Sequence, residues 1–209
     1  LALNISDAVC EAIFSTTELF TNQSIIKFVS DLCEISKKEL TSNYIPRLFS
    51  LYKLIEVADF NIFRIQYIWN KIWKKISEYL MEIIINSQQQ NIWKQALDFL
   101  KQTVSKLLLK ENEYCLAYNF QMDYFIVFET IFYKTNKMPE KEDTVIDYIK
   151  YLVGQYGKNI NSGWIIIFRL LKNAYNINAS KNHENINNIL RIIYDNNNIF
   201  IENNINIFN

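Results

Sequence analysis

The stretch IFRIQYIWNKIWKKISEYLMEI, residues 62–83, decides the fold. Its apolar side chains recur every three or four residues, at Ile62, Ile65, Trp69, Ile72, Ile76, Leu80 and Ile83. Polar side chains, including Lys71, Lys74 and Lys75, fill the opposite side. This spacing predicts an amphipathic helix of about six turns with one apolar face. Because Trp69 and Trp73 continue that face, we expect both indoles in the core, with a carbonyl or carboxylate as any partner of their N–H groups.

The same spacing recurs along the chain and predicts further helices. They span Ile25–Leu40, Pro46–Ile55, Ile92–Leu109, Tyr114–Tyr133, Glu140–Gln155, Gly163–Asn173 and, more weakly, His183–Tyr194. Pro46 is expected as a first helical residue, and Pro139 with the acidic residues after it marks another helix start. With only 3 Gly and 2 Pro, the chain lacks the turns of a β sandwich or barrel. The pattern predicts an all-α fold of antiparallel helix pairs stacked as an armadillo- or HEAT-like α-solenoid, with a compact bundle as the alternative.

Composition narrows the class of protein. The 209 residues carry 22 basic and 22 acidic side chains, which argues against a basic nucleic-acid binder. No apolar stretch approaches the roughly 20 residues of a membrane span. The chain opens at Leu1 rather than Met, which indicates a piece of a longer protein. An Asn-rich end suggests two parts, a helical domain over residues 1–178 and an Asn/Ile-rich end over 179–209 with a weak last helix.

Catalytic chemistry is not expected in this chain. His183 is the single histidine, so neither a two-histidine metal site nor a nucleophile–base pair is easily built. Cys10, Cys33 and Cys115 lie at apolar helical positions, where buried and inert thiols are usual. We therefore expect no catalytic residue, no metal and no cofactor.

Several blocks, in order and at their spacings, resemble one family. They are Phe28–Leu40, Pro46–Ala58, Asn61–Ile65 with Trp69 and Ile72-Trp73, Ala96–Leu100, Tyr118–Gln121 and Ser162–Trp164. The set resembles the first homology region downstream of the Sec-seven catalytic domain in the large, brefeldin-A-sensitive exchange factors for Arf GTPases. The resemblance runs from about residue 10 to 176, and Pro46–Trp73 is its most specific part. Where the family usually has Lys-Pro, this chain has Ile126-Val127, so the helix is expected to continue there.

The resemblance implies a non-catalytic regulatory domain of an Arf guanine-nucleotide exchange factor. Such a region is taken to restrain the exchange domain and to respond to activated Arf, in Golgi vesicle traffic. It implies a cytoplasmic protein peripheral to Golgi or trans-Golgi membranes, with activated Arf, neighbouring domains of the same factor and a peripheral membrane contact as partners, and no nucleic acid. The alternative is a purely architectural helical scaffold that mediates dimerisation or binds partner proteins.

Four residues are candidates for partner or membrane contact. Arg64 precedes the long helix, and we expect it to support the fold or its binding face by pairing with Glu56 or Asp59. Lys71, Lys74 and Lys75 form the densest basic cluster, which is either a solvated helix face or a surface for an acidic partner or an anionic membrane. Trp164 joins Trp69 and Trp73 as a core residue.

Overall fold

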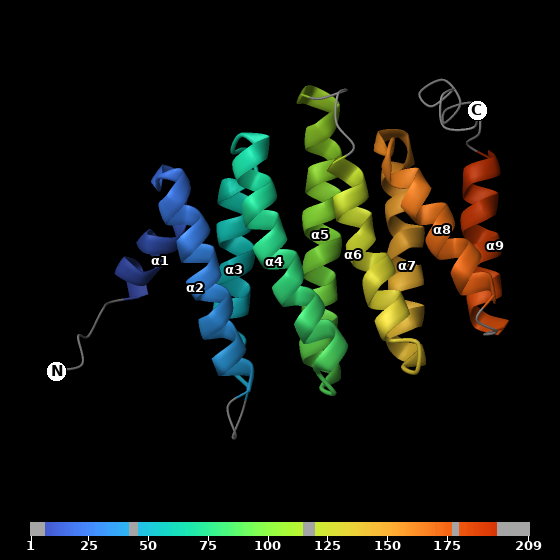
Figure 1. Ribbon diagram of the computed structural model, residues 1–209, viewed down its shortest axis with the longest axis horizontal. Helices are drawn as coiled ribbons and strands as arrows, with labels where there is room; N and C mark the ends of the chain where they lie inside the picture. The colour runs from blue at the N-terminus through green and yellow to red at the C-terminus, as the bar shows by residue number, and fades with distance from the viewer. Residues whose placement is uncertain (1–6, 42–45, 115–119, 177–179, 196–209) are drawn as a thin grey trace. The chain divides into compact units, whose positions relative to one another are not determined.

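In the computed structural model, residues 7–41, 46–114, 120–176 and 180–195 are described, and they form α-helices and two short 3-10 helices without a strand (Figure 1). In chain order these are α1 (Asp7–Ser15), η1 (Thr17–Leu19), α2 (Asn22–Leu40), α3 (Phe49–Asn61), α4 (Gln66–Asn86), α5 (Gln90–Tyr114), α6 (Phe120–Lys134), α7 (Pro139–Tyr156), η2 (Gly157–Asn159), α8 (Gly163–Asn176) and α9 (Ser180–Asp195). The all-α class predicted from helical periodicity is confirmed. The chain divides into two compact units, residues 1–99 and 100–209, and the division falls within α5.

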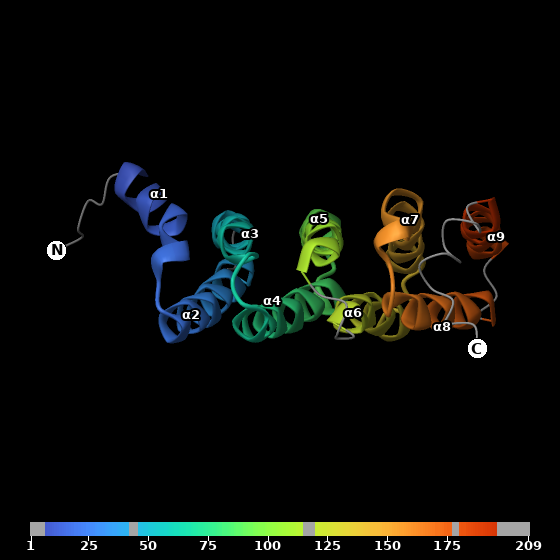
Figure 2. The same ribbon diagram turned by 90° about the horizontal axis from the view of Figure 1, so that it is seen from above.

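In the first unit, α2 and α4 lie side by side in one layer, and α1 and α3 lie in a second layer (Figure 2). The hydroxyl of Tyr79 on α4 donates to the hydroxyl of Ser36 on α2, 43 residues earlier, at 2.5 Å. Between the same two helices Lys37 pairs with Glu82, 45 residues later. Helices of one layer are therefore joined by residues that are one repeat apart in the sequence.

The second unit repeats this arrangement with α6 beside α8 and α7 beside α9. Three bonds between α6 and the α8 segment each join residues 40 apart: Gln121 to Asn161, Glu129 to Arg169 and Tyr133 to Asn173. Between α7 and α9, Asn185 donates to Asp147 across 38 residues at 2.9 Å. A constant offset along both helices means that neighbours within a layer run parallel. The solenoid-like fold predicted from helix pairs of about 40–45 residues is confirmed.

The core is built from the apolar faces that the sequence pattern marks. Trp69, Trp73 and Trp164 are buried, at 0, 4 and 4% exposure, and the rings of Trp69 and Trp73 stack with centroids 6.4 Å apart. The indole N–H of Trp69 lacks a hydrogen-bond partner among the described residues, so the expectation about the kind of partner does not apply to it. Its ring contributes to the core by packing alone.

Helix boundaries differ from the sequence prediction at several places; α6, for example, begins at Phe120 rather than at Tyr114, which is the last residue of α5. The third helix begins at Phe49 rather than Pro46, which lies in an irregular segment ahead of it. The long helix begins at Gln66, because Ile62–Ile65 form a turn with Ile65 as the N-cap in extended geometry. Ile65 therefore leaves the buried stripe in which its spacing had placed it, and it is exposed. Helical periodicity applies only once the helix has begun.

The remaining helices compare with the sequence prediction one by one. α6 runs through Ile126 and Val127, as expected for a chain without the Lys-Pro pair. α1 has no counterpart among the predicted helices. The last helix packs against α7 and buries Ile186 and Ile189. The proposed boundary at residue 178 lies outside the described residues.

Candidate interaction surface

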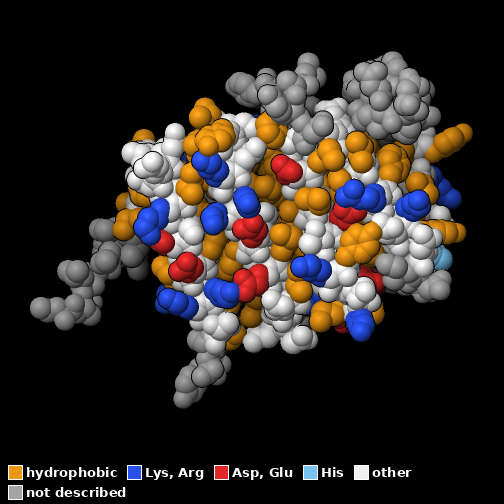
Figure 3. Space-filling view, in the orientation of Figure 1, with side chains coloured by type: hydrophobic (Ala, Val, Ile, Leu, Met, Phe, Trp, Pro, Cys, Tyr) orange, Lys and Arg blue, Asp and Glu red, His pale blue; other side chains and the backbone are white. Residues whose placement is uncertain are grey.

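A group of large apolar side chains stands in solvent where α3 gives way to α4. Phe63, Ile65 and Tyr67 are 74, 67 and 66% exposed, whereas Ile62 and Ile68 at the ends of this segment are buried. Phe60, at the end of α3, is also exposed. We call Phe60, Phe63, Ile65 and Tyr67 the apolar tip. Figure 3 shows hydrophobic side chains gathered at the end of the first unit where α4 begins.

Arg64 fixes the turn between α3 and α4 by hydrogen bonds to the turn that precedes α2. Its Nη2 donates to the carbonyl oxygens of Thr17, Glu18 and Phe20 at 3.1, 2.9 and 2.8 Å. Its Nε donates to the side-chain oxygen of Asn61, and Nη1 donates to that of Asn22 at 3.2 Å. A guanidinium presents five N–H donors in a fixed plane, so one side chain can bind a whole turn. The turn at residues 17–20 and the turn after α3 are thus joined through Arg64.

Asn61 adds buried hydrogen bonds to the contact between these two turns. This side chain is fully buried, and its amide donates to the hydroxyl of Thr17 at 3.1 Å and to the carbonyl of Val57 at 2.8 Å. The Asn61-Ile-Phe-Arg64 block that carries part of the family resemblance is therefore a structural joint. Arg64 supports the turn before α4 through contacts inside the protein.

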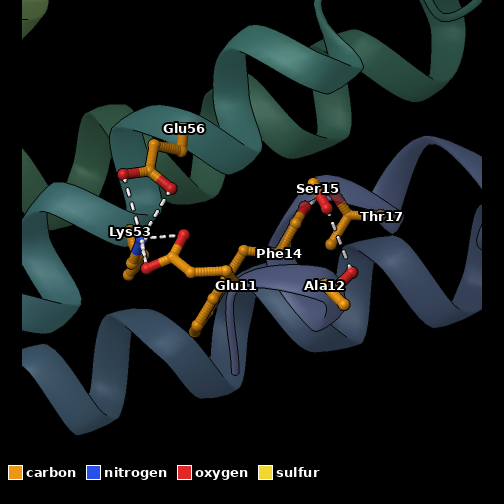
Figure 4. Close-up of polar contacts among 7 residues, drawn as sticks. All are labelled: Glu11, Ala12, Phe14, Ser15, Thr17, Lys53 and Glu56. Atoms are coloured by element: carbon orange, nitrogen blue, oxygen red, sulfur yellow. Dashed lines mark hydrogen bonds and ion pairs between the residues drawn. The ribbon is translucent and has the colours of Figure 1, made fainter. Parts of the chain in front are cut away.

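Glu56, one of the two carboxylates expected to pair with Arg64, binds Lys53 instead (Figure 4). Lys53 is buried and its ammonium lies 2.7 Å from Glu11 on α1 and 2.8 Å from Glu56. Burial alone would lower the pKa of Lys53, but hydrogen bonds to the two carboxylates outweigh it, so the pKa is raised above 10.5. Lys53 thereby ties α1 to α3.

The three lysines of α4 are exposed and follow the apolar tip along the helix. Lys71 lies over the ring of Tyr67, with Nζ 4.2 Å from the ring centroid, so the basic and apolar surfaces touch. Lys74 pairs loosely with Glu78, at 4.0 Å. We call Lys71, Lys74 and Lys75 the basic strip. It lies opposite the buried face of α4, as the sequence pattern requires.

A small cavity of about 280 Å³ lies at the other end of the same helices. It is lined by Lys37, Leu40, Thr41, Tyr79, Glu82, Ile83, Asn86, Ser87, Gln88, Gln89 and Ile92. The two charged residues of the lining, Lys37 and Glu82, pair with each other. Burial raises the pKa of Tyr79, whose hydroxyl is turned to Ser36.

A second family block has a structural role in the other unit. Gln121 is buried, and its side-chain oxygen accepts from the backbone N–H of Asn161 at 2.6 Å and from that of Gly163 at 3.4 Å. Its amide donates to the carbonyl of Asn159 at 2.8 Å. Gly163 itself leaves space for a ring, because a Cβ there would lie 2.5 Å from Phe125. Gln121 of the Asn-Phe-Gln block and Gly163 of the Ser-Gly-Trp block therefore meet at one joint.

Of the cysteines and the histidine, the structure describes the side chains of Cys33 and His183, and both are engaged in contacts within the protein. Burial raises the pKa of the Cys33 thiol to about 12, which disfavours the reactive thiolate. The ring of His183 stacks on Tyr175 and its Nε2 lies 2.9 Å from the carbonyl of the same residue. The side chains of Cys10 and Cys115 lie outside the described residues. Across the described ranges we find no acidic, histidine or cysteine cluster suited to a metal ion, and no helix with the length and apolarity to cross a bilayer.

Sequence reasoning located the basic strip but not the apolar tip. Phe63, Ile65 and Tyr67 alternate with less exposed neighbours, a period of two that could have indicated an extended turn. Because these residues directly precede or begin a helix, the helical spacing of the following residues obscured this alternation. The joints formed by Arg64 and Gln121 depend on contacts 38 to 47 residues away in the sequence, which local spacing does not show.

Comparison with known proteins gives consistent matches. Residues 109–191 match the family described as Mon2/Sec7/BIG1-like, HDS. Brefeldin A-inhibited guanine nucleotide-exchange protein 2 of Arabidopsis thaliana is 33% identical over 88% of this chain and 10% of its own length. Brefeldin A-inhibited guanine nucleotide-exchange protein 1 of Homo sapiens is 32% identical over 84% of this chain and 9% of its own length. The chain thus spans about a tenth of the relatives that it matches.

Proposed function

Since this chain belongs to the family of Sec7-like, brefeldin A-inhibited exchange proteins, as a downstream homology (HDS) region, we propose that it is a non-catalytic regulatory segment of an Arf guanine-nucleotide exchange factor. The identity of about a third over most of the chain carries this proposal. Burial of the Cys33 thiol and the contact of His183 with the carbonyl of Tyr175 support the absence of a catalytic role. In this proposal the exchange reaction belongs to another part of the full-length protein.

The segment acts by contact with activated Arf, and the basic strip is the contact surface. Lys71, Lys74 and Lys75 are exposed on one helix, whose buried face fixes their position. Exposed charges on a rigid surface steer an oppositely charged partner and mainly increase the association rate. Arg64 contributes by holding the start of that helix. Control of exchange activity and recruitment to the cytoplasmic face of Golgi membranes follow from this contact.

A binding experiment with both nucleotide states tests the proposal. The 209-residue chain is immobilised and offered Arf loaded with GTP or with GDP. We expect selective retention of the GTP form, and a loss of retention with Lys71→Glu, Lys74→Glu and Lys75→Glu combined. The matched control reverses three exposed lysines of the second unit, Lys134, Lys137 and Lys172. Equal retention of both nucleotide forms, or equal effects of the two triple variants, would contradict the proposed contact.

The architectural alternative has its own support in the structure. The offset of about 40 residues between bonded helices in each unit is the organisation of a stacked repeat, which can serve as a scaffold without binding a GTPase. Sedimentation of the chain distinguishes the two functions. A stable dimer that retains neither form of Arf would favour the scaffold.

A further inference from the structure

The surface of α4 changes in character along the helix axis. The apolar tip lies at its start, the basic strip follows, and the exposed acidic residues Glu78 and Glu82 come after it. At a rise of 1.5 Å per residue, Lys71 lies about 6 Å beyond Tyr67, Lys75 about 12 Å and Glu82 about 22 Å. An apolar, a basic and an acidic zone thus follow one another along the axis of α4.

The apolar tip is firmly placed and has an apolar neighbour. Leu19 is 78% exposed on the turn whose carbonyls bind Arg64, so it lies close to the tip. Because Arg64 fixes both turns, the apolar side chains are presented with little further loss of backbone entropy. Glu18 beside Leu19 and the half-buried Asp59 beside Phe60 carry negative charge in this region, and Glu78 pairs with Lys74. Arg64 and the three lysines of the basic strip exceed these three negative charges by one.

These zones match the layers of an anionic membrane surface. Interfacial protein segments bury apolar side chains about 5–10 Å deep at the boundary of headgroups and acyl chains. With the tip at that depth, Lys71 falls among the headgroups, and Lys74 and Lys75 lie within the ~8 Å Debye length of their negative charge. The positive end of the α4 dipole also points toward the lipid. The acidic residues of α4 remain in water.

A protein partner is a less suitable occupant of the tip. Binding hot spots lie in pockets sealed from water by a surrounding rim, whereas the tip is a turn at the end of the unit (Figure 1). A lipid interface requires no shape complementarity and accepts protruding Phe, Tyr, Ile and Leu side chains equally well.

We propose that the apolar tip, together with Leu19, inserts into the interfacial layer of an anionic bilayer, with the start of α4 directed toward the lipid and Lys71 at the headgroups, so that Lys74 and Lys75 stay above the headgroups and remain accessible to membrane-bound Arf. This inference rests on the proposed function only in placing the chain at a membrane, and it requires neither Arf nor nucleotide.

Vesicle flotation without Arf tests the proposal directly. The 209-residue chain is mixed with vesicles of phosphatidylcholine alone or with phosphatidylserine added. We expect binding to the anionic vesicles, and a reduction of at least about tenfold on combining Phe63→Ser with Tyr67→Ser or on reversing the basic strip. Leu190→Ser with Tyr194→Ser removes exposed apolar side chains from α9 and is the matched control, which should bind as the wild type does.

Fluorescence quenching measures the insertion itself. Phe63→Trp places an exposed indole at the tip, and the native indoles of Trp69, Trp73, Trp93 and Trp164 are buried and shielded. Brominated acyl chains should quench the new indole on anionic vesicles, whereas Tyr194→Trp should stay unquenched.

The outcomes separate this inference from the proposed function. Vesicle binding that depends on the lysines but not on the tip, or an unquenched indole in the Phe63→Trp variant, would overturn insertion. Failure to float, with loss of GTP-loaded Arf from the Phe63→Ser, Tyr67→Ser variant, would identify the tip as a protein contact instead. Insertion by a chain that retains no Arf would leave this inference standing and refute the Arf contact.

Discussion

Replacing Arg64 by Ala should destabilise the first unit by about 1–4 kcal/mol. The variant leaves the side-chain oxygen of the fully buried Asn61 without its donor, which costs about 1–3 kcal/mol, whereas the carbonyl of Thr17 keeps its hydrogen bond from the backbone N–H of Phe20. The other acceptors belong to exposed or half-buried residues and regain water, so their loss adds at most about 1 kcal/mol in total. Arg64→Lys keeps the charge but cannot span the same set of oxygens, and we expect about half the effect.

Tryptophan fluorescence during urea unfolding measures this change. Trp69, Trp73 and Trp93 lie in the first unit and Trp164 lies in the second, so the signal reports mainly on the unit that contains Arg64. Hydrogen exchange at the amides of residues 17–22 should accelerate in the same variant, because the clamped turn opens. A loss below about 1 kcal/mol for Arg64→Ala, or equal stability of the Lys and Ala variants, would refute the clamp.

Three further predictions address other contacts. Gly163→Ala should destabilise the second unit by about 1–3 kcal/mol in urea unfolding, because its Cβ would lie 2.5 Å from the buried ring of Phe125; an unchanged midpoint would contradict this. Trp69→Phe should cost less than about 1.5 kcal/mol and Trp69→Ala about 3–5, since the indole N–H is unsatisfied; similar losses would show that the N–H matters. Because the pKa of Lys53 is raised on folding, the stability that its ion pairs contribute is complete below pH 10.5 and is lost as the pH rises through the folded pKa. The stability of Lys53→Met, followed by circular dichroism, should therefore fall less steeply at alkaline pH than that of the wild type. The same pH dependence in both proteins would count against the ion cluster.

Local sequence was sufficient for most of the helices and for the basic strip. Period 3.6 placed α4, α5, α7 and α8 within a few residues of their observed bounds, because each buries one continuous apolar face. Lys71, Lys74 and Lys75 were expected outside because the same helix buries Trp69 and Ile72, and the structure exposes them. The apolar tip was missed because Ile65 lies before the helix begins, where the helical period does not hold.

What the sequence determined by itself was the class of fold, the length of its repeat and the family of the chain, since periodicity and ordered motifs are local properties. Only the tertiary structure decided what Arg64 and Gln121 do. Both side chains bond to backbone atoms about 40 residues away, and that distance closes only when successive helix pairs stack. The exposure of Phe63 and Tyr67 was decided in the same way, because a side chain is buried only if a neighbouring element covers it, and none of the described elements buries this turn.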